Sequence, residues 1–575
     1  MKNQNVRIAL GAMATFLAAT FSLPADVKMP AIFGDHMVLQ EGMKLPVWGM
    51  ASPGEAVTVT VGAETASAKA DADGKWRVEL PALAETSAPV TLKVSGNNTL
   101  TFTDVLVGEV WICSGQSNME FPLVTHGGFG GDHNAATVVP QAKDPQLRLF
   151  RVTHATALEP LADVVGKWEL CTPESAAFFS AVAYFFGKEL RADLHRPVGL
   201  IGTYWGGTPA QAWTSISGLE KDPELQHFVE SHKRIAAAFP QLTATLPARQ
   251  ADYKARLGDW QKSPDGVSYD AAMASWKTDC DKAKQAGKPY PPKPVTPQGM
   301  PVAVLPPDGG PGMPANLYNG MIAPLIPFAV KGAIWYQGES NARWPVEYRT
   351  LFARMITDWR EKWGEGDFPF LFVQLAGYHG PAQDGAESWP ILRESQAKAL
   401  SLPRTGMATA VDIGAPTNIH PADKSDVGAR LALAARHIAY NEKVVDSGPV
   451  YNTMTVQGNS IHITFAQEGG GLIIGQAPWV APGSQPLPAD KLLGFSIAGD
   501  DKKWVPADAK IAGDAVVISS PDVANPTAVR YDWDSVPDGN LYNKEMLPAP
   551  PFRTDEETLS YPPPAPPAPA ATAAK

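Results

Sequence analysis

The sequence has few cysteines, no long apolar run beyond its first residues and no excess of positive charge, and each shortage excludes a class of protein. Three cysteines among 575 residues allow at most one disulfide, which excludes a disulfide-stapled scaffold. The net charge of −11 argues against nucleic acid or an anionic membrane as the main partner. The chain also has no phosphate-binding glycine loop and no cluster of metal ligands, so we expect neither a cofactor nor a metal.

The first 25 residues have the pattern of a secretory signal peptide. Lys2 and Arg7 precede an apolar stretch, and Ala25 provides a small residue at which a signal peptidase could cut. The alternative is an uncleaved membrane anchor, for which the apolar stretch is short. We therefore expect an exported protein, periplasmic or extracellular, with no membrane span after cleavage. In that compartment one disulfide could form among Cys113, Cys171 and Cys280; the pairing, with Cys113 and Cys171 as one option, and the oligomeric state are left open.

Two parts of the chain alternate apolar and polar residues as β-strands do. Residues 26–105 contain runs such as Ala56-Val-Thr-Val-Thr-Val between turn signals, which predicts an N-terminal β-sandwich. Residues 441–555 return to this pattern and predict a β-rich C-terminal domain. Residues 556–575 are rich in proline and alanine and predict a disordered tail.

Residues 106–440 alternate strand-like and helix-like runs, which predicts an α/β domain with a parallel sheet and helices on both faces. This domain is interrupted by residues 219–314, which are helical in spacing and then proline-rich. Because this insertion enters between candidate catalytic loops, we expect it to form a wall of the substrate cleft. Trp213, Trp276 and Trp344 are candidate sugar platforms, although packing in a core also explains each of them.

A serine lies on a tight turn directly after a buried strand. The turn reads Ser114-Gly115-Gln116-Ser117-Asn118-Met119, and it differs from the G-x-S-x-G nucleophile elbow because Met119 replaces the last glycine. Such a turn presents a hydroxyl at the carboxyl edge of the sheet, where backbone N–H groups can stabilise an oxyanion. Ser117 is therefore the candidate nucleophile.

A serine nucleophile needs a base, and His420 is the best placed of the 11 histidines. It follows a strand-like run, 407–413, and precedes a helix, so it should lie at the same sheet edge as Ser117. His126 and His133, in a glycine-rich loop after the serine, could border the site. Two further loops at strand ends supply polar groups, namely 204–208, with Gly206 and Gly207, and 335–341, with Gln337.

At these loops the sequence resembles the sialate O-acetylesterase family, a branch of the SGNH hydrolases. The resemblance extends over roughly residues 30 to 555 and includes the N-terminal and C-terminal β regions, the former as an Ig-like domain. The motifs that carry it are Gly115-Gln116-Ser117-Asn118-Met119-Glu120, Trp205-Gly206-Gly207-Thr208-Pro209, Trp335-Tyr336-Gln337-Gly338-Glu339-Ser340-Asn341 and Asn418-Ile419-His420-Pro421.

The resemblance implies an SGNH-type, flavodoxin-like fold and a metal-free serine esterase that removes acetyl groups from sugar hydroxyls. It implies that Ser117 is the nucleophile and His420 the base. The oxyanion hole would consist of the Ser117 N–H, an N–H of Gly206 or Gly207, and the Gln337 side chain. No aspartate stands at the usual positions before the histidine, because Thr417 and Asn418 occupy them. We therefore expect a Ser117–His420 dyad.

Two groups are candidates for orienting His420 in the absence of that aspartate. The first is the Asn418 side chain or a backbone carbonyl of residues 414–418, and the second is Asp412, reaching back from the strand end. The substrate is also open. Acetylated sialic acid and acetylated xylan or xyloglucan share the same chemistry, and a non-catalytic carbohydrate-binding protein is the competing class.

Overall fold

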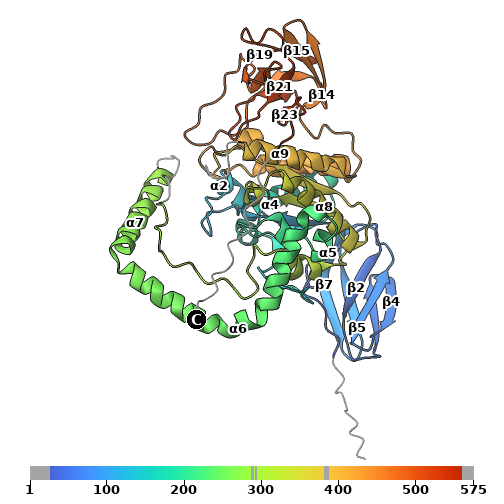
Figure 1. The fold of residues 1–575 in the computed structure, drawn as a ribbon. Helices are drawn as coiled ribbons and strands as arrows, with labels where there is room; N and C mark the ends of the chain where they lie inside the picture. The colour runs from blue at the N-terminus through green and yellow to red at the C-terminus, as the bar shows by residue number, and fades with distance from the viewer. Residues whose placement is uncertain (1–25, 286–290, 292–293, 381–386, 560–575) are drawn as a thin grey trace, which may run out of the picture.

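The computed structural model describes residues 26–285, 291, 294–380 and 387–559. Figure 1 shows a central α/β body with a β region at each of two opposite ends, blue at the N-terminal side and orange at the C-terminal side. The expected signal peptide, residues 1–25, and residues 560–575 of the expected tail lie outside the described residues. Among the helices of the described part, none has both the length and the apolar character needed to cross a membrane.

The N-terminal region is a β-sandwich whose last strand continues into the central sheet. In β3 the alternation Val57, Val59, Val61 is buried on one face, as the period of two predicts. Strand β7 is 17 residues long; its first half pairs with β6 and its second half with β10 and β11. The predicted boundary at residue 105 therefore falls inside one strand. The strands are β1 (Val38–Gln40), β2 (Leu45–Met50), β3 (Ala56–Val61), β4 (Glu64–Lys69), β5 (Lys75–Leu80), β6 (Thr86–Ser95) and β7 (Thr99–Gly115).

The central sheet has the strand order β13-β12-β11-β7-β10-β8-β9, and every neighbouring pair is parallel except β8 and β9. The chain adds β8 and β10 on one side of β7 and then β11, β12 and β13 on the other. Such a reversal beside a central strand is where α/β sheets bind ligands, at the carboxyl ends of the strands. The bounds are β8 (Asp144–Arg151), β9 (Trp168–Cys171), β10 (Val198–Gly202), β11 (Gly332–Tyr336), β12 (Phe370–Gln374) and β13 (Thr405–Thr409).

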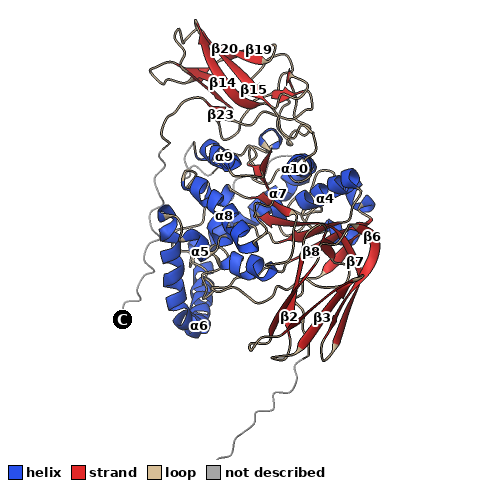
Figure 2. Ribbon diagram, turned by 90° about the vertical axis from the view of Figure 1, so that its right-hand side faces the viewer, coloured by secondary structure: helices blue, strands red, loops and turns tan. Residues whose placement is uncertain are grey.

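Helices cover both faces of this sheet, as Figure 2 shows. Helices α4 and α10 pack on each other and on the strands, and α8 and α9 pack together on the other side. Helix α10 buries Val427, Leu431 and Ala434, which recur at helical spacing. The bounds are α1 (Ser117–Glu120), α2 (Ala135–Val138), α3 (Pro173–Ala177), α4 (Ala181–Leu194), α5 (Ile216–Leu219), α8 (Glu347–Trp363), α9 (Ser388–Lys398) and α10 (Ser425–Ile438).

The predicted insertion contains two long helices, α6 (Gln226–Gln261) and α7 (Pro264–Gln285). Only the first turns of α6 are buried, through Phe228, Val229 and His232. Beyond them the two helices leave the body as an arm, coloured green in Figure 1.

The C-terminal region has a hydrophobic core of its own, separate from the core that the sandwich and the central sheet share. Its two four-stranded sheets have the orders β14-β15-β20-β19 and β18-β17-β21-β23, and β16 pairs with β22. The strands are β14 (Val450–Gln457), β15 (Ser460–Ala466), β16 (Leu472–Ile474), β17 (Phe495–Ala498), β18 (Val505–Pro506), β19 (Asp508–Ala512), β20 (Ala515–Ser519), β21 (Ala528–Tyr531), β22 (Leu541–Asn543) and β23 (Phe552–Arg553).

Candidate active site

The serine turn is tightly held against the neighbouring strand. β7 ends at Gly115, whose φ of 140° suits glycine, and a Cβ at that position would stand 2.2 Å from the carbonyl oxygen of Tyr336. The next residue, Gln116, donates its N–H to that same oxygen at 2.9 Å. Ser117 then opens the short helix α1 with 8% of its surface exposed. The turn therefore fixes the position of the serine while leaving it within reach of a ligand.

The structure brings the predicted base to this serine across 303 positions of sequence. Nε2 of His420 lies 2.8 Å from Oγ of Ser117, which is hydrogen-bond distance. The imidazole also packs edge-on against the ring of Phe129, with the ring centroids 5.2 Å apart. Burial, together with the positive charge of Lys424, lowers the pKa of His420 to about 4. The imidazole is therefore neutral at pH 7 and can accept a proton from the serine.

Gly206 approaches the serine closely, as predicted for its loop. A Cβ at Gly206 would lie 3.3 Å from Cβ of Ser117. Its N–H, one of the predicted oxyanion donors, is bound by Oε2 of Glu120 at 2.6 Å. The other carboxylate oxygen of Glu120 is 3.4 Å from Nε2 of His154, whose ring stacks on Trp205. A carboxylate oxygen thus already accepts from the N–H that was expected to serve an oxyanion.

Gln337 does not present a free donor, which differs from the prediction. Its amide nitrogen donates to Oδ1 of Asn341 at 2.7 Å and to the Thr208 carbonyl at 3.3 Å. Its oxygen accepts from the Tyr348 hydroxyl, and the residue is fully buried. Both amide hydrogens therefore bind inside the protein, because the residue after β11 turns into the core beneath the loop. In this structure Gln337 holds the loop together.

The two groups proposed to orient His420 also behave differently from expectation. Asp412 accepts from Nη1 and Nη2 of Arg430, at 2.6 and 2.8 Å, and from the Tyr542 hydroxyl at 3.0 Å, so its carboxylate forms an ion pair. Asn418 accepts from the backbone N–H of His420 at 3.0 Å and so stabilises the loop. Within the described residues, neither the Asp412 nor the Asn418 side chain forms a hydrogen bond with Nδ1 of His420.

A buried polar cluster lies behind Ser117 and His420, and the sequence did not indicate it. Asn118 donates to the carbonyl of Ile419 and to Oε1 of Glu339, and its oxygen accepts from Nζ of Lys424. Lys424 is fully buried, and burial lowers the pKa of its ammonium group to about 7. Burial also raises the pKa of Glu339. Asn118 and Glu339 stand in two of the quoted motifs, but nothing local in the sequence indicates that they meet.

A pocket of about 330 Å³ adjoins the candidate pair Ser117 and His420. Glu120, which follows the serine by three residues, and Phe129, which packs on His420, both line it. His126 lines it too, whereas His133 contacts the Ala422 carbonyl. Within the described residues, its lining includes none from 219–314. The insertion as a wall of the substrate cleft stays a prediction. Trp213 is fully buried, which confirms packing as its role.

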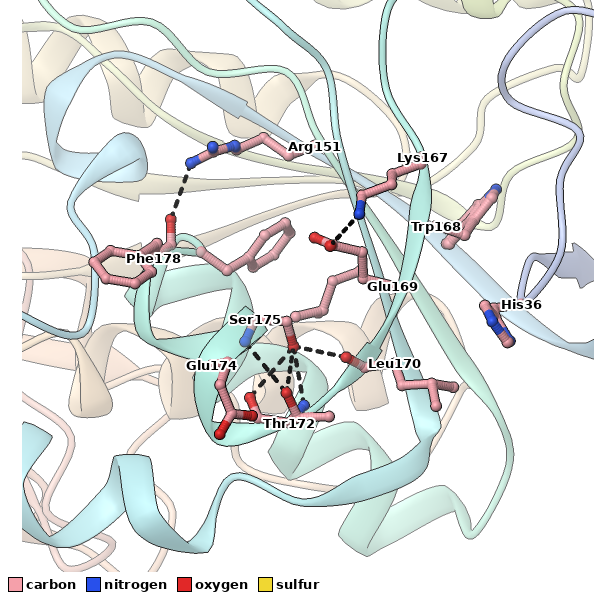
Figure 3. A pocket seen from close by; sticks show the side chains of 12 residues that line it. His36, Arg151, Lys167, Trp168, Glu169, Leu170, Thr172, Glu174, Ser175 and Phe178 are labelled. Atoms are coloured by element: carbon pink, nitrogen blue, oxygen red, sulfur yellow. Dashed lines mark hydrogen bonds and ion pairs between the residues drawn. The ribbon is translucent and has the colours of Figure 1, made fainter.

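A second pocket, of about 500 Å³, lies beside the first, and Arg151 and Phe178 line both. Figure 3 shows Arg151 donating to the Phe178 carbonyl at one end of this pocket and the ion pair of Lys167 with Glu169 across from it. The exposed fraction of Phe178 is 46%, which is large for an aromatic residue. This second pocket therefore combines polar side chains with an exposed aromatic ring.

Two further expectations concern cysteines and metals. Cys113 and Cys171 are buried thiols in contact with the carbonyls of Trp111 and Ala142, and they do not pair with each other. In the part of the chain that is described, no three His, Cys, Asp or Glu residues are grouped so that they could hold a metal ion.

Comparisons with known proteins show which family the chain resembles. A family model for carbohydrate esterases, described as sialic acid-specific acetylesterase, matches residues 311–437. The crystal structure of a carbohydrate acetylesterase from Xanthomonas citri is 37% identical, covers 92% of this chain and all of its own, and superposes with a TM-score of 0.71. The chain belongs to the sialate O-acetylesterase family of carbohydrate acetylesterases.

Curated members of this family match nearly the whole chain. The human sialate O-acetylesterase is 29% identical over 91% of this chain and 92% of its own length, and the rat enzyme is 28% identical over 94% and 97%. Acetylesterases are carboxylic ester hydrolases, and this protein is therefore a carboxylic ester hydrolase. Membership of this family indicates that the protein hydrolyses O-acetyl esters of carbohydrates.

Proposed function

We propose that the protein is an exported esterase that removes O-acetyl groups from carbohydrates through an acetyl-serine intermediate on Ser117. The observation that carries this proposal is the 2.8 Å contact of Ser117 Oγ with a neutral His420 at the carboxyl edge of the central sheet. A hydroxyl with a neutral imidazole at hydrogen-bond distance is the arrangement that generates a serine nucleophile.

In the first step Oγ of Ser117 attacks the acetyl carbonyl carbon while its proton passes to Nε2 of His420. The carbonyl oxygen becomes an oxyanion in the tetrahedral intermediate. The bond from the acetyl carbon to the sugar oxygen then breaks, and His420 gives its proton to that sugar oxygen. The products of this step are a free sugar hydroxyl and acetyl-Ser117.

In the second step water attacks acetyl-Ser117 with His420 again as the base. One proton of the water passes to Nε2, and then to Oγ when the acyl bond breaks. The other proton leaves with the acetyl group as acetic acid, which ionises to acetate at neutral pH. The cycle consumes one water for each acetyl group and returns both side chains to their starting states.

The oxyanion donors in this scheme are the N–H groups of Ser117 and Gly206. The contact with Glu120 supports the choice of Gly206, because the Gly206 N–H already donates a hydrogen bond to an anionic oxygen, Oε2 of Glu120. A bound acetyl group has to take the place of that oxygen. A single donor of this kind contributes about 2.7–4 kcal/mol of transition-state stabilisation.

The sugar itself would occupy the pocket lined by Glu120, Phe129 and His154. The relatives named sialate O-acetylesterase favour an acetylated sialic acid, and the acetylated plant polysaccharides xylan and xyloglucan are the second candidate class. Export is proposed from residues 1–25 alone, and the mass of the mature chain purified from its own cells tests it: loss of those residues is expected.

The test of function is acetate release from a chromogenic acetyl ester, from O-acetylated sialoglycoconjugates and from acetylated xylan and xyloglucan oligosaccharides. We expect the wild type to release acetate and Ser117→Ala to lose the activity by about 10⁴-fold or more, with unchanged thermal unfolding. Release by Ser117→Ala at the wild-type rate would contradict the acetyl-serine mechanism. No release by the wild type from any of these substrates would favour a carbohydrate-binding protein.

A further inference from the structure

The position of His420 has to be held by something other than the usual aspartate. Asp412 is committed to Arg430, and Asn418 binds the backbone N–H of His420. The ring itself contacts Ser117 and the aromatic residues Phe121 and Phe129. Catalysis by a serine and a histidine depends on their separation, and a misplacement of about 1 Å can cost about 100-fold. The loop that carries His420 therefore needs an anchor on the serine side.

Asn118 supplies such an anchor, because it joins the two halves of the catalytic pair. It follows Ser117 directly in the chain, and its amide nitrogen donates at 2.9 Å to the carbonyl of Ile419, the residue before His420. The same nitrogen donates at 2.5 Å to Oε1 of Glu339, on the loop after β11. One buried amide thus connects the serine turn, the histidine loop and a third catalytic loop.

Lys424 fixes which way this amide points. Its Nζ donates to Oδ1 of Asn118 at 2.6 Å, so a flipped amide would set an NH₂ group against an ammonium. The ammonium lies over the rings of Phe121, at 4.8 Å, and Tyr336, at 5.3 Å. Its backbone N–H also binds the carboxylate of Asp132 at 2.9 Å, which holds the start of α10.

The groups that face Lys424 come from every element packed around it. They are the carboxylates of Glu339, Asp423 and Asp132, the imidazole of His420 and the phenol of Tyr336. The three carboxylates partly offset the effect of burial on the ammonium, and the ammonium disfavours a proton on His420. Lys424 therefore acts on the histidine both through Asn118 and through its charge.

We propose that Asn118 and Lys424 are positioning residues that hold the His420 loop against the Ser117 turn, in place of the aspartate of a complete triad. The proposal rests on the assignment of Ser117 and His420 as the catalytic pair. Asn118 sets the separation of the two loops, and Lys424 sets the orientation of Asn118 and keeps His420 unprotonated.

The experiment compares Asn118→Ala and Lys424→Met with wild type and with Lys331→Met. Lys331 is a matched control, because its Nζ also lies near a buried carboxylate, 3.5 Å from Glu109, and over an aromatic ring, Tyr440, but at the start of β11. Two readouts are recorded between pH 4 and 9. One is kcat and KM on a small acetyl ester, and the other is the rate at which a phosphonofluoridate labels Ser117 with loss of fluoride.

Asn118→Ala is expected to lower kcat by about 10- to 100-fold with little change in KM. Lys424→Met is expected to move the acidic limb of both profiles to higher pH by about one unit, because His420 then binds a proton more readily. A purely structural role would lower stability or rate without moving that limb. Lys331→Met is expected to keep the wild-type kcat and the wild-type limb.

Wild-type kcat in Asn118→Ala overturns the proposal, whether or not Lys424→Met folds. Thermal unfolding checks that Lys424→Met is folded. If it is folded and the acidic limb of its pH profiles does not move, the role assigned to Lys424 is overturned. A wild type that neither releases acetate nor reacts at Ser117 with the phosphonofluoridate refutes the catalytic pair itself, which separates failure of the proposed function from failure of this proposal.

Discussion

Asp412 provides the sharpest test of how the site is built, because the sequence made it a candidate for orienting His420 and the structure places it in an ion pair with Arg430. Its carboxylate receives two hydrogen bonds from Arg430, at 2.6 and 2.8 Å, and one from Tyr542. The exposed fractions of the two charged side chains are 2% and 6%. The ion pair connects the end of β13, helix α10 and strand β22 of the C-terminal region.

The perturbation is Asp412→Asn, which keeps the shape and removes the charge. Removing one partner of a buried pair leaves the other charge uncompensated and costs about 3–5 kcal/mol. Each hydrogen bond to a charged group contributes about 1.5–3 kcal/mol, so two bonds account for a loss of that size. We therefore expect a large fall in the free energy of unfolding and an almost unchanged kcat for the molecules that stay folded.

The assay is denaturant unfolding followed beside kcat and KM below the unfolding transition. Glu361→Gln is the control, since Glu361 forms an ion pair with Lys221 in which both side chains are about half exposed. Such a surface pair contributes at most about 1 kcal/mol. A fall in kcat of about 10³- to 10⁴-fold with unchanged stability would refute this reasoning and would make Asp412 the acid of a triad.

Three further predictions follow from the serine turn and the histidine loop. Gly115→Ala should destabilise the protein by about 3 kcal/mol or more and abolish activity, because the new Cβ would meet a backbone oxygen at 2.2 Å. The control Gly62→Ala is also at positive φ but has no atom within 4 Å of its Cβ, so it should cost about 1 kcal/mol. Thermal unfolding and acetate release are measured for both variants. Activity should persist below pH 6.5 and fall only as the pH approaches about 4, because His420 acts unprotonated and its pKa is lowered in the folded protein. The stability that His420 contributes is likewise present above pH 6.5 and lost between pH 6.5 and 4. An acidic limb at pH 6.5 in the kcat/KM profile would contradict this environment of His420. Asn418→Asp places an anion two residues from His420, so the acidic limb should move to higher pH and kcat should rise; an unmoved limb would show that this side chain has no electrostatic access to the imidazole.

Much of the site could be read from local patterns. Ser117 and His420 each follow a strand-like run, and parallel strands bring their carboxyl ends to one edge, so the sequence alone placed both side chains at that edge. The family resemblance named Gly206 as an oxyanion donor, and its backbone lies near the serine. The placement of Ser117 and His420 needed only the order of strands and helices.

The roles of Gln337, Asp412 and Lys424 could not be read in this way. Each stands on or near a strand-end loop, but its side-chain direction depends on a partner elsewhere in the chain. That partner is the Thr208 carbonyl for Gln337, and Arg430 and Tyr542 for Asp412. Lys424 reads as an ordinary surface lysine before a helix, and only the packed structure shows that its ammonium is buried against Asn118.

The sequence by itself indicated the class of fold, the family resemblance and the two candidate catalytic residues, because strand and helix periodicity and strand-end motifs are local properties of the chain. The tertiary structure decided which polar groups are free to act on a substrate and which hold the site together. That decision depends on burial, since a polar group taken out of water must find a partner in the fold, and the partners come from segments up to 306 positions apart.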